Sequence, residues 1–211
     1  ETKIIVRYID EDNPENNKSA VANVTVLGHA DDYRTAPHMG SGDEFTVALK
    51  ADGTVWTWGK NTEGQLGQGG RTSDRNIIPT QVTFSGLASN AYITKIAVGK
   101  AHVVALDSDG NIWTWGDNTY GQLGDGTYGT SNVDKFVPRQ VRIGQNESNT
   151  KLLTNIKYVA AGANSSAAID QDGLLYVWGN NDNGQLGVDG KIVAYPTLVE
   201  ALKDNPATPN A

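Results

Sequence analysis

Acidic side chains flank Asp-Gly pairs at a spacing that resembles a calcium-binding loop. Carboxylate or amide groups alternate around two of these pairs, at Asp107, Asp109 and Asn111 and again at Asp170 and Asp172. Side-chain oxygens in a D-x-D-x-D-G pattern are the ligands that Ca²⁺ prefers. The distal bidentate Glu is missing, however, and Lys50 stands in the leading position of a third related segment. We interpret the segments as hairpin turns, with calcium binding as the alternative.

The three histidines are the other candidates for chemistry. They are His29, His38 and His102, and the chain has no cysteine. A nucleophilic site would therefore need a serine or threonine beside one of them. Ser41 and Thr35 flank His38 in sequence, but closeness in sequence does not build a triad. We expect a non-enzymatic protein with no catalytic residue, no cofactor and no bound metal.

A repeated segment organises these residues along the chain. The sequence G-Q-L-G occurs at Gly64–Gly67, Gly121–Gly124 and Gly184–Gly187, each time after an Asp-Gly pair and a Trp-Gly step. The tryptophans of those steps, Trp58, Trp115 and Trp178, recur with a period of about 60 residues. That period suits a four-stranded propeller blade with its loops rather than a helical pair.

Each repeat reads as four strands. The first strands follow an I-x-x-[I/V]-x-x-G pattern from Ile93 and Ile156, degraded to Ala36, Met39 and Gly42 in the first copy. The second are predicted at Phe45–Leu49, Val103–Leu106 and Ser166–Ile169, and the third at Val55–Trp58, Ile112–Trp115 and Leu175–Trp178. The fourth are predicted at Pro79–Val82, Pro138–Val141 and Pro196–Val199, each opened by a proline that suits an edge strand. The fold class is therefore all-β, with three propeller blades forming a partial ring or half of a two-chain ring.

The turns and the aromatic residues have structural interpretations. The pairs Asp52-Gly53, Asp109-Gly110 and Asp172-Gly173 predict hairpins in which both turn residues have φ > 0. Aromatic residues two apart share one face of a strand, so Trp56 with Trp58, Trp113 with Trp115, and Tyr176 with Trp178 are predicted to pack between blades rather than form a ligand cage. The recurring Asn61/Gln65, Asn118/Gln122 and Asn181/Gln185 are interpreted as turn-stabilising residues, with ligand binding as the alternative.

Loops that differ between the copies are the candidate binding residues. Loop 68–78 carries Arg71 and Arg75, and loop 125–137 carries Tyr128, Lys135 and Phe136. Tyr120 stands where the other copies have Glu63 and Asn183. Aromatic and arginine side chains on firmly held loops are common anchors of protein interfaces. We therefore predict partner binding through Arg71, Arg75, Tyr120, Tyr128, Lys135 and Phe136, with surface variation as the alternative.

Composition narrows the choice of function class, and the segments that flank the repeats complete the domain organisation. The net charge of −7 argues against a basic surface for nucleic acid, and no apolar run reaches the ~20 residues that span a bilayer. Residues 1–35 do not fit the repeat and read as a β segment with strands at Thr2–Ile9 and Ala20–Leu27. Three repeats follow at about 36–92, 93–155 and 156–199, and residues 200–211 read as a tail or linker.

The repeat resembles a known family. The second copy fits the pattern best, through Gly99, His102, Ala105, Leu106, Asp109, Gly110, Ile112, Trp115, Gly116, Asn118 and Gly121–Gly124. It resembles the regulator of chromosome condensation repeat, and the resemblance covers roughly residues 36–199. The resemblance implies a β-propeller, commonly of seven blades, and functions that include nucleotide exchange on a small GTPase, chromatin docking, ultraviolet sensing and inhibition of β-lactamases.

From the residues and the resemblance together we expect a bacterial protein-interaction module at the cell surface or outside the cell. The alternatives are a guanine-nucleotide exchange-like regulator of a small GTPase and a carbohydrate-binding surface module. Three blades leave apolar faces without a neighbour. We therefore expect either further blades in a longer ring or a homodimer that closes the ring.

Overall fold

The computed structural model describes residues 33–129, 136–144 and 151–202. The chain divides into two units, residues 1–33 and 34–211, and the described structure lies almost entirely in the second. The strands predicted at Thr2–Ile9 and Ala20–Leu27, and the tail beyond residue 202, lie outside the described residues. Within the described ranges, no helix has the length and apolar character needed to cross a membrane.

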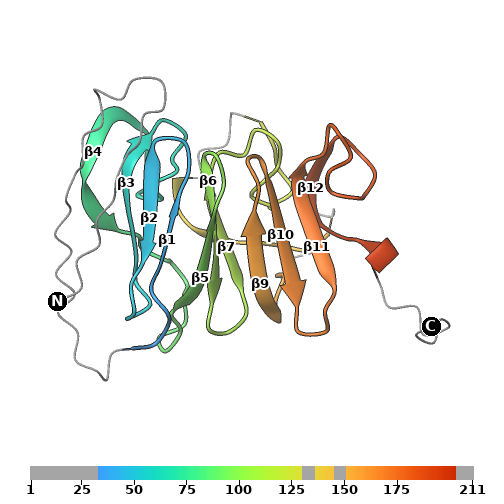
Figure 1. Ribbon diagram of the computed structural model, residues 1–211, viewed down its shortest axis with the longest axis horizontal. Helices are drawn as coiled ribbons and strands as arrows, with labels where there is room; N and C mark the ends of the chain where they lie inside the picture. Colours follow the sequence, from blue (N-terminus) through green and yellow to red (C-terminus); the bar gives the residue numbers. More distant parts are fainter. Residues whose placement is uncertain (1–32, 130–135, 145–150, 203–211) are drawn as a thin grey trace, which may run out of the picture. The chain divides into compact units, whose positions relative to one another are not determined.

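The described strands form three four-stranded antiparallel sheets, one for each predicted repeat (Figure 1). Blade 1 contains β1 (His38–Ser41), β2 (Phe45–Leu49), β3 (Val55–Asn61) and β4 (Thr72–Gln81). Blade 2 contains β5 (Ile93–Val98), β6 (His102–Asp107), β7 (Ile112–Gly116) and β8 (Arg139–Gln140). Blade 3 contains β9 (Ile156–Ala161), β10 (Ser165–Asp170), β11 (Leu175–Asn180) and β12 (Ile192–Leu198), followed by a 3₁₀ turn at Glu200–Leu202. The predicted all-β fold of three propeller blades is confirmed.

The Asp-Gly hairpins are confirmed, but their backbone differs from the prediction. In blade 1 the Gly53 N–H donates to the Lys50 carbonyl at 2.9 Å, and the Lys50 N–H donates to the Thr54 carbonyl at 2.9 Å. Gly53 has φ of 83°, whereas Asp52 is not among the described non-glycine residues with positive φ. The prediction of two left-handed turn residues is therefore wrong. One left-handed glycine closes a three-residue hairpin loop with a bulge, so the Asp keeps an ordinary conformation.

The fourth strands also begin earlier than predicted in blades 1 and 3. Pro79 lies inside β4 and Pro196 lies inside β12, while Pro138 directly precedes β8. In blade 1 the register passes from Thr57 opposite Thr80 to Gly59 opposite Asn76, so residues 77–79 bulge opposite Trp58. Residues 194–196 bulge opposite Trp178 in the same way. Because a bulged edge residue needs no ladder hydrogen bond, proline is tolerated within the strand.

The cores lie between neighbouring blades. Strand β6 contributes residues to the core on each side of blade 2. Val103 and Ala105 belong to the cluster shared with blade 1. Val104 and Leu106 belong to the cluster shared with blade 3. Alternation along one strand therefore covers both faces of the middle sheet. Trp113, Trp115 and Trp178 are buried in these clusters, and Tyr176 packs against the second cluster, which confirms the predicted packing for four of the six aromatic positions. Trp56 and Trp58 of blade 1 are only half-buried.

Candidate interaction surface

The Asp-Gly segments use their carboxylates within the hairpin. The buried Asp107 Oδ1 accepts hydrogen bonds from the backbone N–H groups of Asp109 and Asn111, at 3.0 and 2.9 Å. Its Oδ2 accepts from the Trp113 indole N–H at 2.9 Å. Asp170 accepts from two backbone N–H groups in the same way. These contacts support the hairpin interpretation, and no group of three or more acidic or histidine side chains in the described ranges could hold a metal ion.

Of the histidines that the structure describes, one is exposed and one is buried. His29 lies outside the described residues, and His38 is exposed at the start of β1. His102 is fully buried between blades 2 and 3, with its Nε2 3.0 Å from the Ser166 hydroxyl, which donates to the Gln122 carbonyl at 2.8 Å. Burial lowers the pKa of His102 to about 4, although the Asp117 carboxylate opposes that shift. A neutral histidine sealed between two sheets has a structural role here.

The recurring Asn and Gln side chains hold the loops after each Trp-Gly step. The Oδ1 atoms of Asn61, Asn118 and Asn181 accept from the backbone N–H groups of Leu66, Leu123 and Leu186 at 3.1, 3.1 and 2.9 Å. The Gln65 and Gln122 Oε1 atoms accept from the N–H groups of Glu63 and Tyr120, both at 2.8 Å. The predicted turn-stabilising role is confirmed. These bonds hold the ends of the variable loops in fixed positions.

Two of the predicted binding residues meet across two blades. Arg71 follows the first G-Q-L-G segment, and its guanidinium carbon lies 5.1 Å from the centre of the Phe136 ring. Phe136 also covers Gly64, where any added Cβ would collide with its ring. The Gly69 N–H donates to the Phe136 carbonyl at 2.9 Å. Arg71 is exposed and Phe136 is half-buried, so this cation–π pair presents a firmly held positive group.

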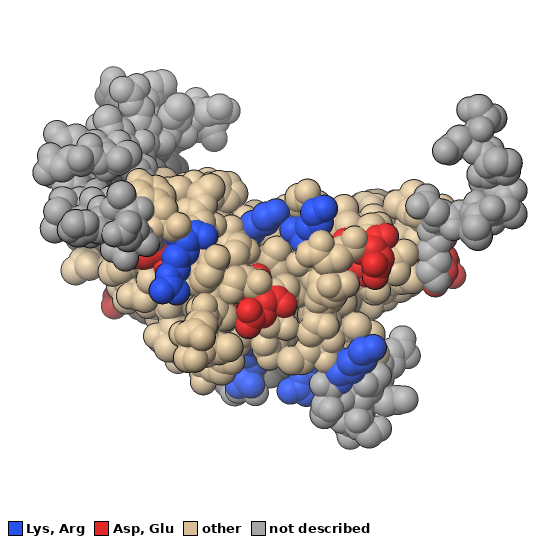
Figure 2. Space-filling model, turned by 90° about the horizontal axis from the view of Figure 1, so that it is seen from below, with Lys and Arg blue, Asp and Glu red and all other residues tan. Residues whose placement is uncertain are grey.

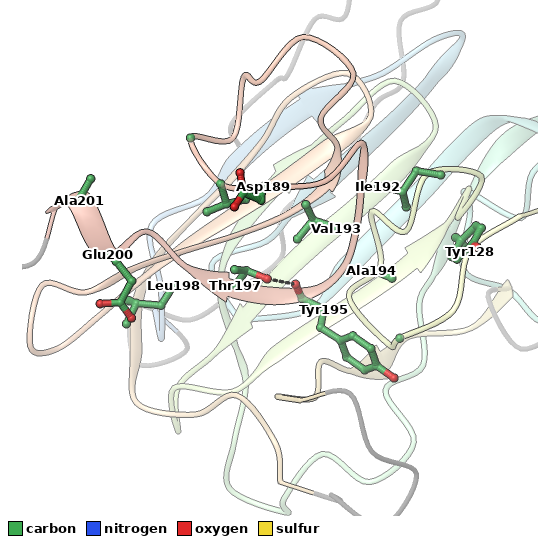
Figure 3. A pocket seen from close by; sticks show the side chains of 13 residues that line it. Tyr128, Asp189, Ile192, Val193, Ala194, Tyr195, Thr197, Leu198, Glu200 and Ala201 are labelled. Atoms are coloured by element: carbon green, nitrogen blue, oxygen red, sulfur yellow. Dashed lines mark hydrogen bonds between the residues drawn. The ribbon is translucent and has the colours of Figure 1, made fainter.

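Tyr128 lies apart from that pair, at a groove of about 720 Å³ along β12 (Figure 3). Its side chain is 64% exposed. The groove is lined by apolar and aromatic side chains including Ile192, Tyr195 and Leu198, with Asp189 and Glu200 among its polar residues. The Tyr195 carbonyl accepts from the Thr197 hydroxyl at 3.1 Å, the bond drawn in Figure 3. Two tyrosines, Tyr128 and Tyr195, and two carboxylates, Asp189 and Glu200, therefore line the same groove.

The remaining predicted residues are separate from both places. Arg75 is exposed on β4, and Tyr120 is half-buried in the turn before the second G-Q-L-G segment. Lys135 lies outside the described residues. On the face shown in Figure 2, basic and acidic side chains are scattered rather than gathered into one patch.

Sequence reasoning missed several exposed or groove-lining apolar residues. They are Ile77 and Ile78 on β4 and Ile192 and Tyr195 on β12. A signal was present for Ile77, Ile78 and Tyr195, because they belong to the pairs of residues that precede the three fourth-strand prolines: Ile77-Ile78, Phe136-Val137 and Ala194-Tyr195. Aligned on the prolines, these pairs occupy one structural position in the three blades.

Stacked four-stranded antiparallel blades, with one Trp-to-carbonyl contact per interface, define a β-propeller repeat module. The chain belongs to the Regulator of chromosome condensation (RCC1) repeat family, which it matches over residues 52–106, 109–169 and 172–209. A second description of the same repeat matches residues 38–65, 93–122 and 156–185.

Known proteins show the same relationship. The chain is 37% identical to the E3 ubiquitin-protein ligase HERC2 of Homo sapiens over 169 residues, which cover 78% of this chain and 3% of HERC2. It is 31% identical to the ultraviolet-B receptor UVR8 of Arabidopsis thaliana, covering 76% of this chain and 33% of that receptor. Among solved structures, Prp20p of Saccharomyces cerevisiae is similar with a TM-score of 0.62 and 25% identity, over 81% of this chain and 39% of that one. The chain thus spans well under half the length of these relatives.

Proposed function

We propose that this chain is a non-enzymatic protein-interaction module whose partner contacts the loops between the third and fourth strands of its blades. The observation that supports this proposal most directly is the Arg71–Phe136 pair, which joins the loops of two blades. The Arg71 guanidinium carbon lies 5.1 Å from the centre of the Phe136 ring. Arginine and aromatic side chains that are held in place before binding lose little side-chain freedom when a partner docks. The Asn and Gln bonds at the loop ends supply that rigidity.

Relatives support a protein partner. Yeast RCC1 (Prp20) has been crystallised bound to Kap60, and it is 26% identical to this chain over 76% of the chain. Prp20p was also described with its binding properties to Gsp1p and histones. Those partners belong to those proteins. For this chain we propose only the class, a protein partner held at the Arg71–Phe136 pair, with Tyr128 as a second contact.

The test is quantitative affinity capture with matched variants. Arg71→Ala and Tyr128→Ala remove exposed side chains from the two loop regions, and Lys157→Ala removes an exposed cation from β9 as the control. We expect at least one protein captured by the wild type and by Lys157→Ala to fall at least tenfold with a loop variant. Equal capture of every protein by all four forms would show that the loop assignment is wrong.

A guanine-nucleotide exchange-like role is the second candidate, favoured by the likeness to Prp20p. A nucleotide-release assay against a panel of small GTPases separates it from simple binding. Accelerated release would make the module a regulator of nucleotide exchange, whereas capture without release supports the first proposal. Binding on a glycan array would instead support the carbohydrate-binding alternative.

We also propose that the protein is bacterial and lies at the cell surface or outside the cell. The acidic composition, with 24 Asp and Glu against 17 Lys and Arg, suits a module at a solvated surface. Protease accessibility of the protein on intact source cells tests this part. Digestion without cell lysis supports it, and protection until lysis contradicts it.

A further inference from the structure

The two internal blade interfaces repeat one set of contacts. The Trp115 indole N–H of blade 2 donates to the Gln65 carbonyl of blade 1 at 3.0 Å, and the Trp178 indole N–H of blade 3 donates to the Gln122 carbonyl of blade 2 at 2.8 Å. The residue two positions before the fourth-strand proline then covers the first glycine of the preceding G-Q-L-G segment. Phe136 covers Gly64, and Ala194 covers Gly121.

Backbone bonds complete the same interface. The Gly69 N–H donates to the Phe136 carbonyl at 2.9 Å, and the Gly126 N–H donates to the Ala194 carbonyl at 3.0 Å. In the turns after the first strands, the Asp43 N–H donates to the Lys100 carbonyl at 2.7 Å, and the Lys100 N–H donates to the Ala163 carbonyl at 2.9 Å. Each blade therefore has two different sides. The side that carries the G-Q-L-G segment, which we call the socket side, faces the next blade. The side that carries the tryptophan of the Trp-Gly step faces the preceding blade.

Blade 3 has a socket side without an occupant among the described residues. Gln65 and Gln122 are 1% and 0% exposed, whereas Gln185 in the same position is exposed. A Cβ placed on Gly184 would meet nothing within 4 Å. Ile169 is 36% exposed, while Leu106, its counterpart on β6, is 3% exposed. This open side continues the pattern of the two filled interfaces.

Blade 1 has the complementary side exposed. Ile77 and Ile78 occupy the positions of Phe136 and Val137, and they are 71% and 72% exposed. Trp58 is half-buried, whereas its counterparts Trp115 and Trp178 are 0% exposed. Two adjacent exposed isoleucines beside a tryptophan make an apolar surface of the kind that proteins normally cover.

We propose that blade 1 of one copy docks onto blade 3 of a second copy, with Trp58 donating to the Gln185 carbonyl and Ile77 covering Gly184. The second copy fits because this chain itself carries both halves of an interface that it already forms twice. The contact is reciprocal, so two copies form it twice and bring together six blades from two sets of three sheets. Six lies within the range of about four to eight blades found in propellers.

Solution mass tests the pairing. Light scattering across a range of concentrations is expected to give the mass of two chains for the wild type. The double variant Ile77→Asp/Ile78→Asp changes only exposed side chains and is expected to give the mass of one chain, since it places two charges in the contact. Tyr158→Asp, on β9 at 49% exposure, is the matched control and is expected to remain a dimer.

Cross-linking tests the orientation. The chain has no cysteine, so single-cysteine variants report one position each. By analogy with Val137 near Gly69 and Tyr195 against Gly126, Ile78 of one copy lies near Asp189 of the other. A short bismaleimide is expected to link an equilibrated mixture of Ile78→Cys and Asp189→Cys at least fivefold more than either variant alone, or than a mixture of Ile78→Cys with Tyr158→Cys.

These measurements distinguish a dimer formed through blades 1 and 3 from a monomer and from a dimer formed through another surface. None of them depends on the partner proposed above. A wild-type monomer, or a dimer that survives Ile77→Asp/Ile78→Asp, overturns the proposal. So does a dimer whose Ile78–Asp189 cross-link does not exceed the controls. A dimer lost in the double variant and cross-linked at this pair supports it.

Discussion

The buried Asp107 carboxylate holds two backbone amides and the Trp113 indole of one hairpin. Removing one acceptor from several buried donors leaves each of them without a partner, which costs more than the bonds contribute on average. Asp170 occupies the equivalent place in blade 3, but Tyr176 stands where blade 2 has Trp113, so no indole depends on it. Asp107 also accepts from the Asn111 side-chain amide, at 3.1 Å to its Oδ2, whereas blade 3 has Leu174 at that position. The difference between the two variants therefore measures the indole and Asn111 bonds together.

We expect Asp107→Ala to lower the free energy of unfolding by about 2–4 kcal/mol, and Asp170→Ala by about 1–2 kcal/mol. Urea unfolding followed by tryptophan fluorescence measures both. An equal or larger loss for Asp170→Ala would remove the Trp113 and Asn111 bonds from the explanation.

His102 makes stability depend on pH. Its folded-state pKa of about 4 lies below the ordinary 6.5, so the unfolded chain takes up the proton first as the pH falls. The stabilisation is complete above pH 6.5 and is lost progressively down to pH 4, by up to about 3 kcal/mol. Phe45 fills the equivalent place in blade 1, so His102→Phe is the matched variant. Urea unfolding between pH 7.5 and 4.5 is expected to show a steeper loss for the wild type. Parallel curves for the two proteins would contradict a buried neutral His102.

The sequence predicted which residue types are candidates for binding more readily than it predicted which residues contact one another in the fold. Arg71 and Phe136 were both candidates, but their contact joins loops of different blades and depends on how those blades stack. Tyr195 was missed because a proline pattern placed it before a short strand, whereas β12 begins at Ile192 and includes it in a bulge. Bulges depend on pairing between strands, which spacing along one chain does not specify.

At the scale of elements, the last glycine of each G-Q-L-G segment reports whether its interface is filled. Gly67, Gly124 and Gly187 have nearly the same backbone, with φ of 68°, 69° and 70°. A Cβ would lie 2.8 Å from the Trp115 indole nitrogen at Gly67 and 2.9 Å from that of Trp178 at Gly124. At Gly187 its nearest neighbour would be Val199, at 3.8 Å. Alanine therefore causes the same backbone strain at all three sites and crowds a tryptophan at only two.

In the Ile77→Asp/Ile78→Asp background, which keeps the comparison monomeric under the pairing proposed above, we expect Gly187→Ala to cost about 1 kcal/mol. Gly67→Ala and Gly124→Ala are expected to cost at least about 1–2 kcal/mol more, because the indole must move. Chemical unfolding measures the differences. Three equal losses would show that backbone strain alone sets the cost and that the Trp–Gly approach adds nothing.

Elements were predictable where local chemistry determines them. β2 matches its predicted bounds, Phe45–Leu49, because alternating apolar residues end at a hairpin that needs a left-handed glycine. β4 does not, since it runs from Thr72 rather than Pro79 and its first half pairs through two register shifts with β3. The variable loop 68–78 is thus largely strand, which places Arg75 on a sheet edge rather than on a free loop.

At the scale of the whole molecule, blade 2 differs from its neighbours because both of its faces are covered. Every residue of β6 and β7 is buried, whereas β2 and β10 alternate between buried and more exposed positions. In repeat proteins each unit is stabilised mainly by its neighbours, so an end blade with one open side opens more easily than a blade between two others.

Native-state hydrogen exchange is expected to show this difference in the Ile77→Asp/Ile78→Asp variant. Amides of β6 and β7 should exchange at least about tenfold more slowly than those of β2, β3, β10 and β11, since opening blade 2 breaks two interfaces and opening an end blade breaks one. In the wild type, pairing between copies should slow exchange in the end blades more than in blade 2, because only their faces gain a neighbour. Uniform protection across the three blades would instead mean that they open as one cooperative unit, and the interfaces would then not act as separate contributions to stability.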